Sequence, residues 1–148
     1  MARGCRWRLR APCAARANAA ARKQGHFEVL LRLWTSEAWQ SLWDSLALEV
    51  TSFERLGLSH DMSDRELWQR CQQREIVLLT ANRNDEGPES LEATIRALND
   101  PGSLPVFTIA DPESVFMRRD YAERVAIQIL EYLLELDNFR GVGRLYVP

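Results

Sequence analysis

Cysteine is scarce in this sequence. Its 148 residues include only Cys5, Cys13 and Cys71, and no two of them form a C-x-x-C pair. An odd number of cysteines without such a pair argues against a disulfide framework and predicts a reducing, cytoplasmic environment. Long apolar runs are missing too, because the longest candidate, from Val125 to Leu136, is interrupted by polar side chains. A membrane span needs about 18 mainly apolar residues, so we expect no membrane partner.

Several catalytic signatures are also missing. The sequence has no G-x-S-x-G elbow, which argues against an α/β-hydrolase or a related acyltransferase. It has neither a P-loop nor a G-x-G-x-x-G turn. The two histidines, His26 and His60, have no partner at metal-ligand spacing. We therefore expect no zinc site.

Acidic side chains are absent from residues 1–23, which carry seven of the 19 lysine and arginine residues. The rest of the chain holds the other 12 basic side chains against 21 acidic ones, a net charge of about −9. A protein that coats nucleic acid is more often basic. An acidic domain can still act on a phosphodiester if metal ions lie between the two sets of negative charge.

Residues 1–23 are rich in alanine and arginine and show no strand pattern. Three interpretations remain open. The segment could be a disordered basic arm that touches nucleic acid. It could be an organelle targeting peptide, since these are rich in arginine and poor in acids. It could also result from a misassigned start codon or a shifted reading frame.

Residues 24–148 have the patterning of one folded domain. Apolar spacing predicts helices over 27–46, from the Ser63–Glu66 capping box, from Pro88 to Leu98, and over 120–138. Strands are predicted over 48–53, 76–80, 104–110 and 144–147. Strands that alternate with helices imply a mainly parallel sheet with helices on its faces. Binding sites in such sheets form at the carboxyl ends of the strands, which here are Thr80–Asp85 and Ala110–Asp111.

The segment Thr80–Asp85 places short oxygen-bearing side chains at the end of a buried strand. Such side chains are the ligands that Mg²⁺ prefers. Ordinary turn chemistry accounts for the same residues, because Asn and Asp are common in any turn. Helix-start or turn chemistry likewise accounts for Asp64, Glu92 and Asp111.

Three stretches together resemble a known family. They are Ser63–Trp68 (SDRELW), Ile76–Asn84 (IVLLTANRN) and Gly87–Glu92 (GPESLE). The pattern resembles small bacterial PIN-like proteins, which are relatives of toxin-type ribonucleases, and the similarity extends from about Gln24 to Pro148. The resemblance implies a three-layer α/β fold in which helices flank a mainly parallel central sheet.

The resemblance also implies an endoribonuclease site that binds Mg²⁺ or Mn²⁺. The metal would lower the pKa of a bound water and stabilise the charge on the scissile phosphate of RNA. Asp64 matches the acid of the middle helix, and Asn82 and Asn84 stand where active relatives carry Asp-x-Asp. We expect these three in the catalytic site. The expected metal ligands are Asp64, Asp85 and Asp111, and the expected substrate contacts are Arg83 and Ser90.

The two asparagines leave an alternative open. An amide can coordinate a metal through its oxygen but brings no negative charge, so Asn82 and Asn84 should weaken metal binding. The alternative is a non-catalytic PIN-like module that binds RNA or an antitoxin-like partner protein. The family also makes a homodimer a candidate assembly.

The largest departure from the family pattern lies in the N-terminal part of the sequence. The family pattern begins with an apolar strand that ends in Asp, just before the position of Gln24–His26. Here Ala19–Lys23 occupies that place. We therefore expect the first strand to be missing or aberrant, and we hypothesise that residues 1–23 come from a misassigned start or a frameshift.

Overall fold

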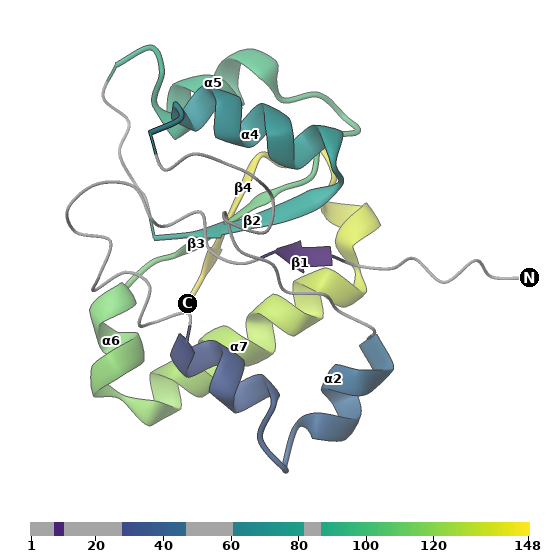
Figure 1. Ribbon diagram of the computed structural model, residues 1–148, viewed down its shortest axis with the longest axis vertical. Coiled ribbons are helices and arrows are strands. Elements are labelled where there is room, and N and C mark those ends of the chain that lie inside the picture. Colours follow the sequence, from purple (N-terminus) through teal and green to yellow (C-terminus); the bar gives the residue numbers. More distant parts are fainter. Residues whose placement is uncertain (1–7, 11–27, 47–60, 82–86) are drawn as a thin grey trace, which may run out of the picture.

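The computed structural model describes residues 8–10, 28–46, 61–81 and 87–148 (Figure 1). The predicted strand over 48–53 and the turn residues Asn82, Arg83, Asn84 and Asp85 lie outside these ranges. The described residues include a helical segment over 28–34, and the further elements are α2 (Gln40–Leu46), α4 (Asp64–Gln73), α5 (Leu91–Leu98), α6 (Pro112–Met117), α7 (Arg119–Leu134), the 3-10 helix η1 (Leu136–Phe139) and the strands β1 (Arg8–Arg10), β2 (Ile76–Thr80), β3 (Val106–Ile109) and β4 (Arg144–Val147).

The strands form a parallel sheet in the order β1-β2-β3-β4. Leu79 is opposite Phe107 in the β2–β3 pair, and Phe107 is opposite Leu145 in the β3–β4 pair. The predicted strands at 76–80 and 144–147 are confirmed, and the strand predicted over 104–110 is observed as the shorter β3. The sequence thus predicts the α/β class and the parallel sheet correctly.

The strand β1 corrects the expectation that residues 1–23 contain no strand. Arg8 is opposite Ile76 and Arg10 is opposite Leu78, so this short segment pairs with β2 in parallel. Strand pairing uses backbone groups that every residue except proline carries. A three-residue segment can therefore join a sheet without an alternating side-chain pattern, because the neighbouring strand supplies the hydrogen-bond partners.

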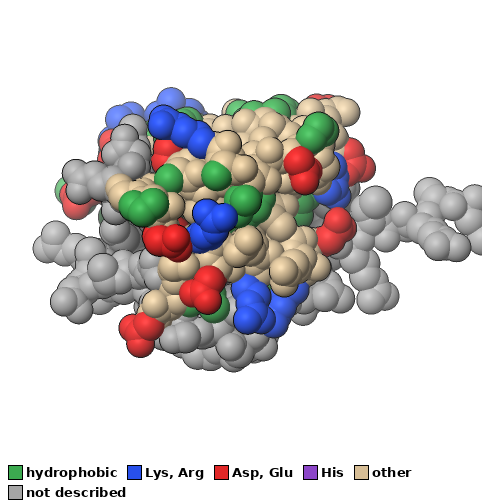
Figure 2. All heavy atoms as spheres, turned by 90° about the horizontal axis from the view of Figure 1, so that it is seen from above, with side chains coloured by type: hydrophobic (Ala, Val, Ile, Leu, Met, Phe, Trp, Pro, Cys, Tyr) green, Lys and Arg blue, Asp and Glu red, His purple; other side chains and the backbone are tan. Residues whose placement is uncertain are grey.

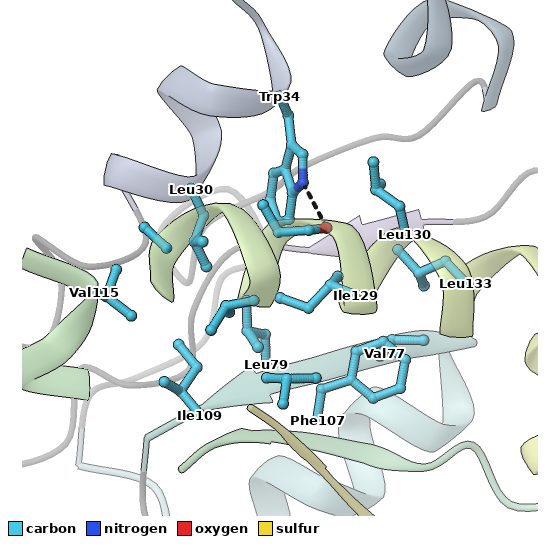
Figure 3. Close-up of a cluster of buried hydrophobic side chains, with 14 of the residues drawn as sticks. Leu30, Trp34, Val77, Leu79, Phe107, Ile109, Val115, Ile129, Leu130 and Leu133 are labelled. Atoms are coloured by element: carbon cyan, nitrogen blue, oxygen red, sulfur yellow. Dashed lines mark hydrogen bonds between the residues drawn. The ribbon is translucent and has the colours of Figure 1, made fainter. Parts of the chain in front are cut away.

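Helices cover both faces of the sheet (Figure 1). On one face α4 and α5 pack over Ile76, Leu78 and Val106. On the other face α7 and the helical residues 28–34 pack over the intervening residues of the same strands, which are Val77, Leu79, Phe107 and Ile109 (Figure 3). The alternation of strand side chains thus divides the interior into two apolar clusters.

The start of α4 follows the sequence prediction. The Ser63 hydroxyl accepts a hydrogen bond of 3.1 Å from the Glu66 backbone N–H, and the Glu66 carboxylate accepts one of 3.1 Å from the Ser63 N–H. This reciprocal pair is a capping box, and it satisfies two backbone N–H donors at the N-terminal end of the helix. Because the box is made by residues three apart, it can be predicted from the sequence.

The helix predicted over 27–46 is observed as two pieces, residues 28–34 and α2. At the break the hydroxyls of Thr35 and Ser36 bond the carbonyl oxygens of Leu31 and Leu33, at 2.8 and 2.7 Å. Such bonds compete with the helical backbone pattern and favour a bend. The bend lets the Trp34 and Trp43 rings stack with their centroids 5.2 Å apart.

Two other helix boundaries differ from the prediction. Pro88 precedes α5 in a turn and does not lie in its first turn, because Ser90 caps the helix by accepting a hydrogen bond from Ala93 N–H at 3.2 Å. The apolar spacing predicts a last helix that reaches residue 138, but α7 ends at Leu134 and is followed by η1. A tighter 3-10 turn is a common ending for an α-helix.

Candidate functional site

The carboxyl edge of the sheet is the left-hand edge in Figure 1. The helix α4 leads into β2, while α5 follows β2 and α6 follows β3. In parallel α/β units, the starts of the helices share an edge with the ends of the strands. The carboxyl edge therefore carries Asp64, Thr80, Ser90 and Asp111.

The connections that leave β2 and β3 diverge at this edge. The chain leaves β2 toward α5 on one face and leaves β3 toward α6 and α7 on the other. Since the sheet continues in one direction from β2 to β4, these two crossovers have opposite hands. Ligands of open parallel sheets bind in the crevice outside the carboxyl ends of the strands. The ends of β2 and β3 are thus the best-placed candidate site.

A buried ionic group lies between α5 and the sheet. The Arg144 guanidinium donates a hydrogen bond of 3.1 Å from Nε to the Glu92 carboxylate and one of 2.6 Å from Nη1 to the Thr108 hydroxyl. We call these three residues the Arg144 cluster. The Arg144 side chain is only 8% exposed, and Thr108 is fully buried. Hydrogen bonds to ionised groups are stronger when they are shielded from water.

The Arg144 cluster lies toward the carboxyl edge. In the sheet, Arg144 is opposite Val106 but its guanidinium reaches Thr108, two residues further along β3. Thr108 is in turn opposite Thr80, the last residue of β2. Glu92 is the second residue of α5. The cluster thus places one positive and one negative charge beside the strand ends.

Asp64, a predicted catalytic residue and metal ligand, lies in the described part of the chain. It is the first residue of α4 and is 7% exposed. The N-terminal end of a helix stabilises a carboxylate through the helix dipole. The start of α4 lies at the edge of the sheet at which β2 and β3 end.

Ser90 and Asp111 have structural roles in the described part of the chain. The Ser90 hydroxyl caps α5. Asp111 caps α6: one carboxylate oxygen accepts from Ser114 N–H at 3.3 Å and the other accepts from the Ser114 hydroxyl at 2.6 Å. The hydrogen bond from the Ser114 hydroxyl has the largest effect and the one from its N–H the next, and together they hold the pKa of Asp111 below its usual value. Asp111 is therefore ionised but engaged by its own helix.

Within the described ranges, no three His, Cys, Asp or Glu side chains are grouped so that they could hold a metal ion. Glu92 bonds Arg144, and Asp111 bonds Ser114. Asp64 is a predicted metal ligand that lies in the described part of the chain, and Mg²⁺ is often held by one or two carboxylates together with waters and substrate phosphate. The full predicted set, with Asp85, stays a prediction because Asp85 lies outside the described residues.

Tyr121 ties the ends of β3 and β4 together at this edge. Its hydroxyl accepts a hydrogen bond of 3.1 Å from Asp111 N–H and donates one to the Pro148 carbonyl oxygen. Burial, with the nearby Asp111 carboxylate, raises the pKa of Tyr121 above its usual value. The neutral phenol is thus the form that the fold prefers.

The outer side of α4 and α5 has a mixed charge. Figure 2 shows arginine and acidic side chains interspersed there, with small apolar areas between them. Nucleic-acid proteins that bind through charge alone gather their basic side chains on one face or along one helix. The face shown in Figure 2 does not have that pattern, so it does not compete with the carboxyl edge as a candidate RNA site.

The Arg144 cluster is the part of the site that sequence patterns miss. Glu92 reads as an ordinary helix-start acid, and Arg144 as one residue of a short strand. The available signal is that Arg144 and Tyr146 share one face of β4, which gives that face a polar character. Which acid pairs with Arg144 depends on the tertiary fold.

No protein-family model matches the chain, and neither a curated protein nor a solved structure matches it. Among the described residues, no helix combines the length and apolar character that a membrane crossing requires.

Proposed function

We propose that this chain is a PIN-like domain that binds RNA at the carboxyl edge of its sheet and cleaves it with Mg²⁺ or Mn²⁺. The supporting observation is the place of Asp64, a nearly buried carboxylate at the start of α4 on the edge where the connections from β2 and β3 diverge. The motif resemblance supplies the family and the role proposed for Asp64.

The chain's own residues account for part of this chemistry. When bound, the metal would lower the pKa of a water and offset charge on the phosphate. Asp64 would hold the ion. Arg144 offsets the negative charge of Glu92 beside the strand ends, which lowers the repulsion that an RNA phosphate would meet there. Its bonds to Glu92 and Thr108 fix the guanidinium, so this charge stays in place.

A second candidate is a non-catalytic PIN-like module that binds RNA or an antitoxin-like protein. The observation that favours it is the engagement of Glu92 by Arg144 and of Asp111 by Ser114. The Arg144 guanidinium offsets the charge of Glu92, and Ser114 occupies both carboxylate oxygens of Asp111, so neither acid can bind a metal ion without losing these bonds. Under this candidate RNA binding persists without turnover and without added metal.

The experiment compares RNA cleavage and RNA binding in one set of variants. Purified chain is incubated with labelled single-stranded RNA, with and without Mn²⁺, alongside Asp64→Asn and Asp44→Asn. Asp44 is an exposed acid on α2, away from the strand ends, so it is the matched control. We expect Asp64→Asn to lower cleavage at least about tenfold and Asp44→Asn to leave it unchanged.

Each result decides between the two candidates. Binding without cleavage in the wild type supports the non-catalytic module. Equal cleavage by the wild type and Asp64→Asn contradicts the metal role of Asp64. If the wild type neither binds nor cleaves RNA while circular dichroism shows a folded chain, RNA is not its ligand.

A further inference from the structure

We infer that a groove between α2 and α7 binds a basic amphipathic helix of a partner protein. The α2–α7 groove has a volume of about 360 Å³ and is lined by Ala38, Trp39, Leu42, Ile127, Leu130, Glu131 and Leu134. It lies on the opposite side of the sheet from α4 and α5 (Figure 1). It is therefore separate from the Arg144 cluster.

The walls of the groove are apolar and open to solvent. Leu42 is 43% exposed, Ile127 is 43% exposed and Leu134 is 54% exposed. Ile127 and Leu134 lie two turns apart on the outward side of α7, and the buried Leu130 lines the groove between them. A different stripe of α7 packs against the sheet and is buried, and it includes Val125, Ile129 and Leu133. The core thus accounts for Leu130 and the buried stripe of α7, and it leaves an outward stripe of Ile127 and Leu134 uncovered.

Two acidic side chains border this outward stripe, and one of them, Glu131, accepts a hydrogen bond of 3.3 Å from the Gln128 side chain. A second hollow of about 330 Å³ continues from the groove, since both are lined by Glu131 and Leu134, and Glu135 lines the second one. Within the described part of the chain neither Glu131 nor Glu135 takes part in an ion pair. The last turn of α7 contains no basic residue. Acids near a helix C-terminus are unfavourable because they meet the negative end of the helix dipole.

These charges select the kind of occupant. Nucleic acid and anionic lipid would be repelled by Glu131 and Glu135. A second copy docked through the same groove about a two-fold axis would bring these acids against their own counterparts. A helix with apolar side chains at i, i+3, i+4 and i+7 and with flanking Lys or Arg satisfies both the apolar stripe and the acidic border.

The probe is a synthetic helical peptide of about 18 residues with leucines at that spacing and lysines on both flanks. A second peptide carries glutamates in place of the lysines. Binding of the fluorescently labelled peptides to the full chain is measured by anisotropy. We expect the wild type to bind the lysine peptide at least about tenfold more tightly than the glutamate peptide.

The variants test both parts of the surface. Glu131→Lys/Glu135→Lys should reverse the preference between the peptides, and Leu134→Gln should weaken binding of the lysine peptide. Glu113→Lys changes an exposed acid on α6 and should have no effect. Thermal melting establishes that each variant is folded.

The inference is overturned if the wild type does not bind the lysine peptide, if it binds both peptides equally, or if the charge reversal leaves the preference unchanged. A wild-type dimer that Leu134→Gln dissociates would also overturn it, because a second copy would then occupy the groove.

Discussion

The indole N–H of Trp34 donates a hydrogen bond of 3.2 Å to the carbonyl oxygen of Ala126 (Figure 3). Both residues are fully buried. The bond joins the helical residues 28–34 to the middle of α7 across 92 positions of sequence. Trp34 also stacks on Trp43, so one side chain connects three helical segments.

Replacing Trp34 by phenylalanine should lower the free energy of unfolding by about 1–2 kcal/mol. The lost hydrogen bond accounts for about 1 kcal/mol, and the smaller ring leaves space in the core. Urea denaturation measures the change. Trp43→Phe is the control, because Trp43 is only partly buried and should cost less. An equal loss in both variants would contradict the role given to the Trp34–Ala126 bond.

Removing the cap of α4 should destabilise the fold locally. Ser63→Ala deletes the acceptor of the Glu66 N–H and should cost about 1 kcal/mol, while Ser63→Asp should retain most of the stability. Ser45→Ala serves as the control, since Ser45 is exposed in the last turn of α2 and caps no N-terminus. Chemical denaturation of the three variants checks this. If Ser63→Asp is as unstable as Ser63→Ala, the capping explanation is wrong.

The Arg144–Glu92 pair should show measurable coupling. A double-mutant cycle of Arg144→Met and Glu92→Gln should give a coupling energy of about 1–2 kcal/mol, because the guanidinium is almost entirely shielded from water. The control cycle uses Arg119 and Glu123, a 2.9 Å pair on α7 whose side chains are 84% and 40% exposed. Exposed pairs couple by only a few tenths of a kcal/mol. Similar coupling in the two cycles would mean that burial adds nothing to the Arg144 pair.

Stability should fall in alkali through Tyr121. Burial raises its pKa in the folded state, so the folded protein holds the phenol proton to higher pH than the unfolded chain does. The contribution of Tyr121 is therefore complete below about pH 10 and is lost as the pH rises through the raised folded pKa. A pH titration of the wild type and of Tyr121→Phe, followed by the ultraviolet absorbance of tyrosinate, isolates Tyr121 as the difference between the two curves. The midpoint of that difference should lie above pH 10. A midpoint at or below 10 would refute the burial effect.

Sequence patterns predict the elements of this fold where local contacts decide them. The capping box of Ser63 and Glu66 spans one helical turn, and β2 is one continuous apolar run, so both are visible in the sequence. The break after Trp34 is missed because the apolar spacing continues through it, and side chain to backbone bonds at Thr35 and Ser36 end the helix. The strand β1 is missed because its pairing depends on β2.

The candidate site is predictable in position but not in composition. Parallel strand order fixes the carboxyl edge, and Asp64 at a helix start follows from the capping box. The Arg144 cluster joins residues 36 and 52 positions apart, so its pairing becomes visible only in three dimensions. The resemblance predicts a substrate contact for Ser90, yet Ser90 is the N-cap of α5, and its spacing to Ala93 is the sequence signal for that role.

The two apolar clusters differ in how much of the chain each requires. The cluster under α4 and α5 draws its members from Met62 to Leu98 together with Val106, whereas the cluster under α7 draws from Val29 to Val147. During synthesis the first set of partners leaves the ribosome together, while the second must wait for the final strand. We therefore expect amides of α4 and β2 to gain protection earlier in refolding than those of residues 28–34, which pulse-labelled hydrogen exchange can time. A nascent chain stalled before β4 would then expose mainly the α7 face of its sheet to chaperones.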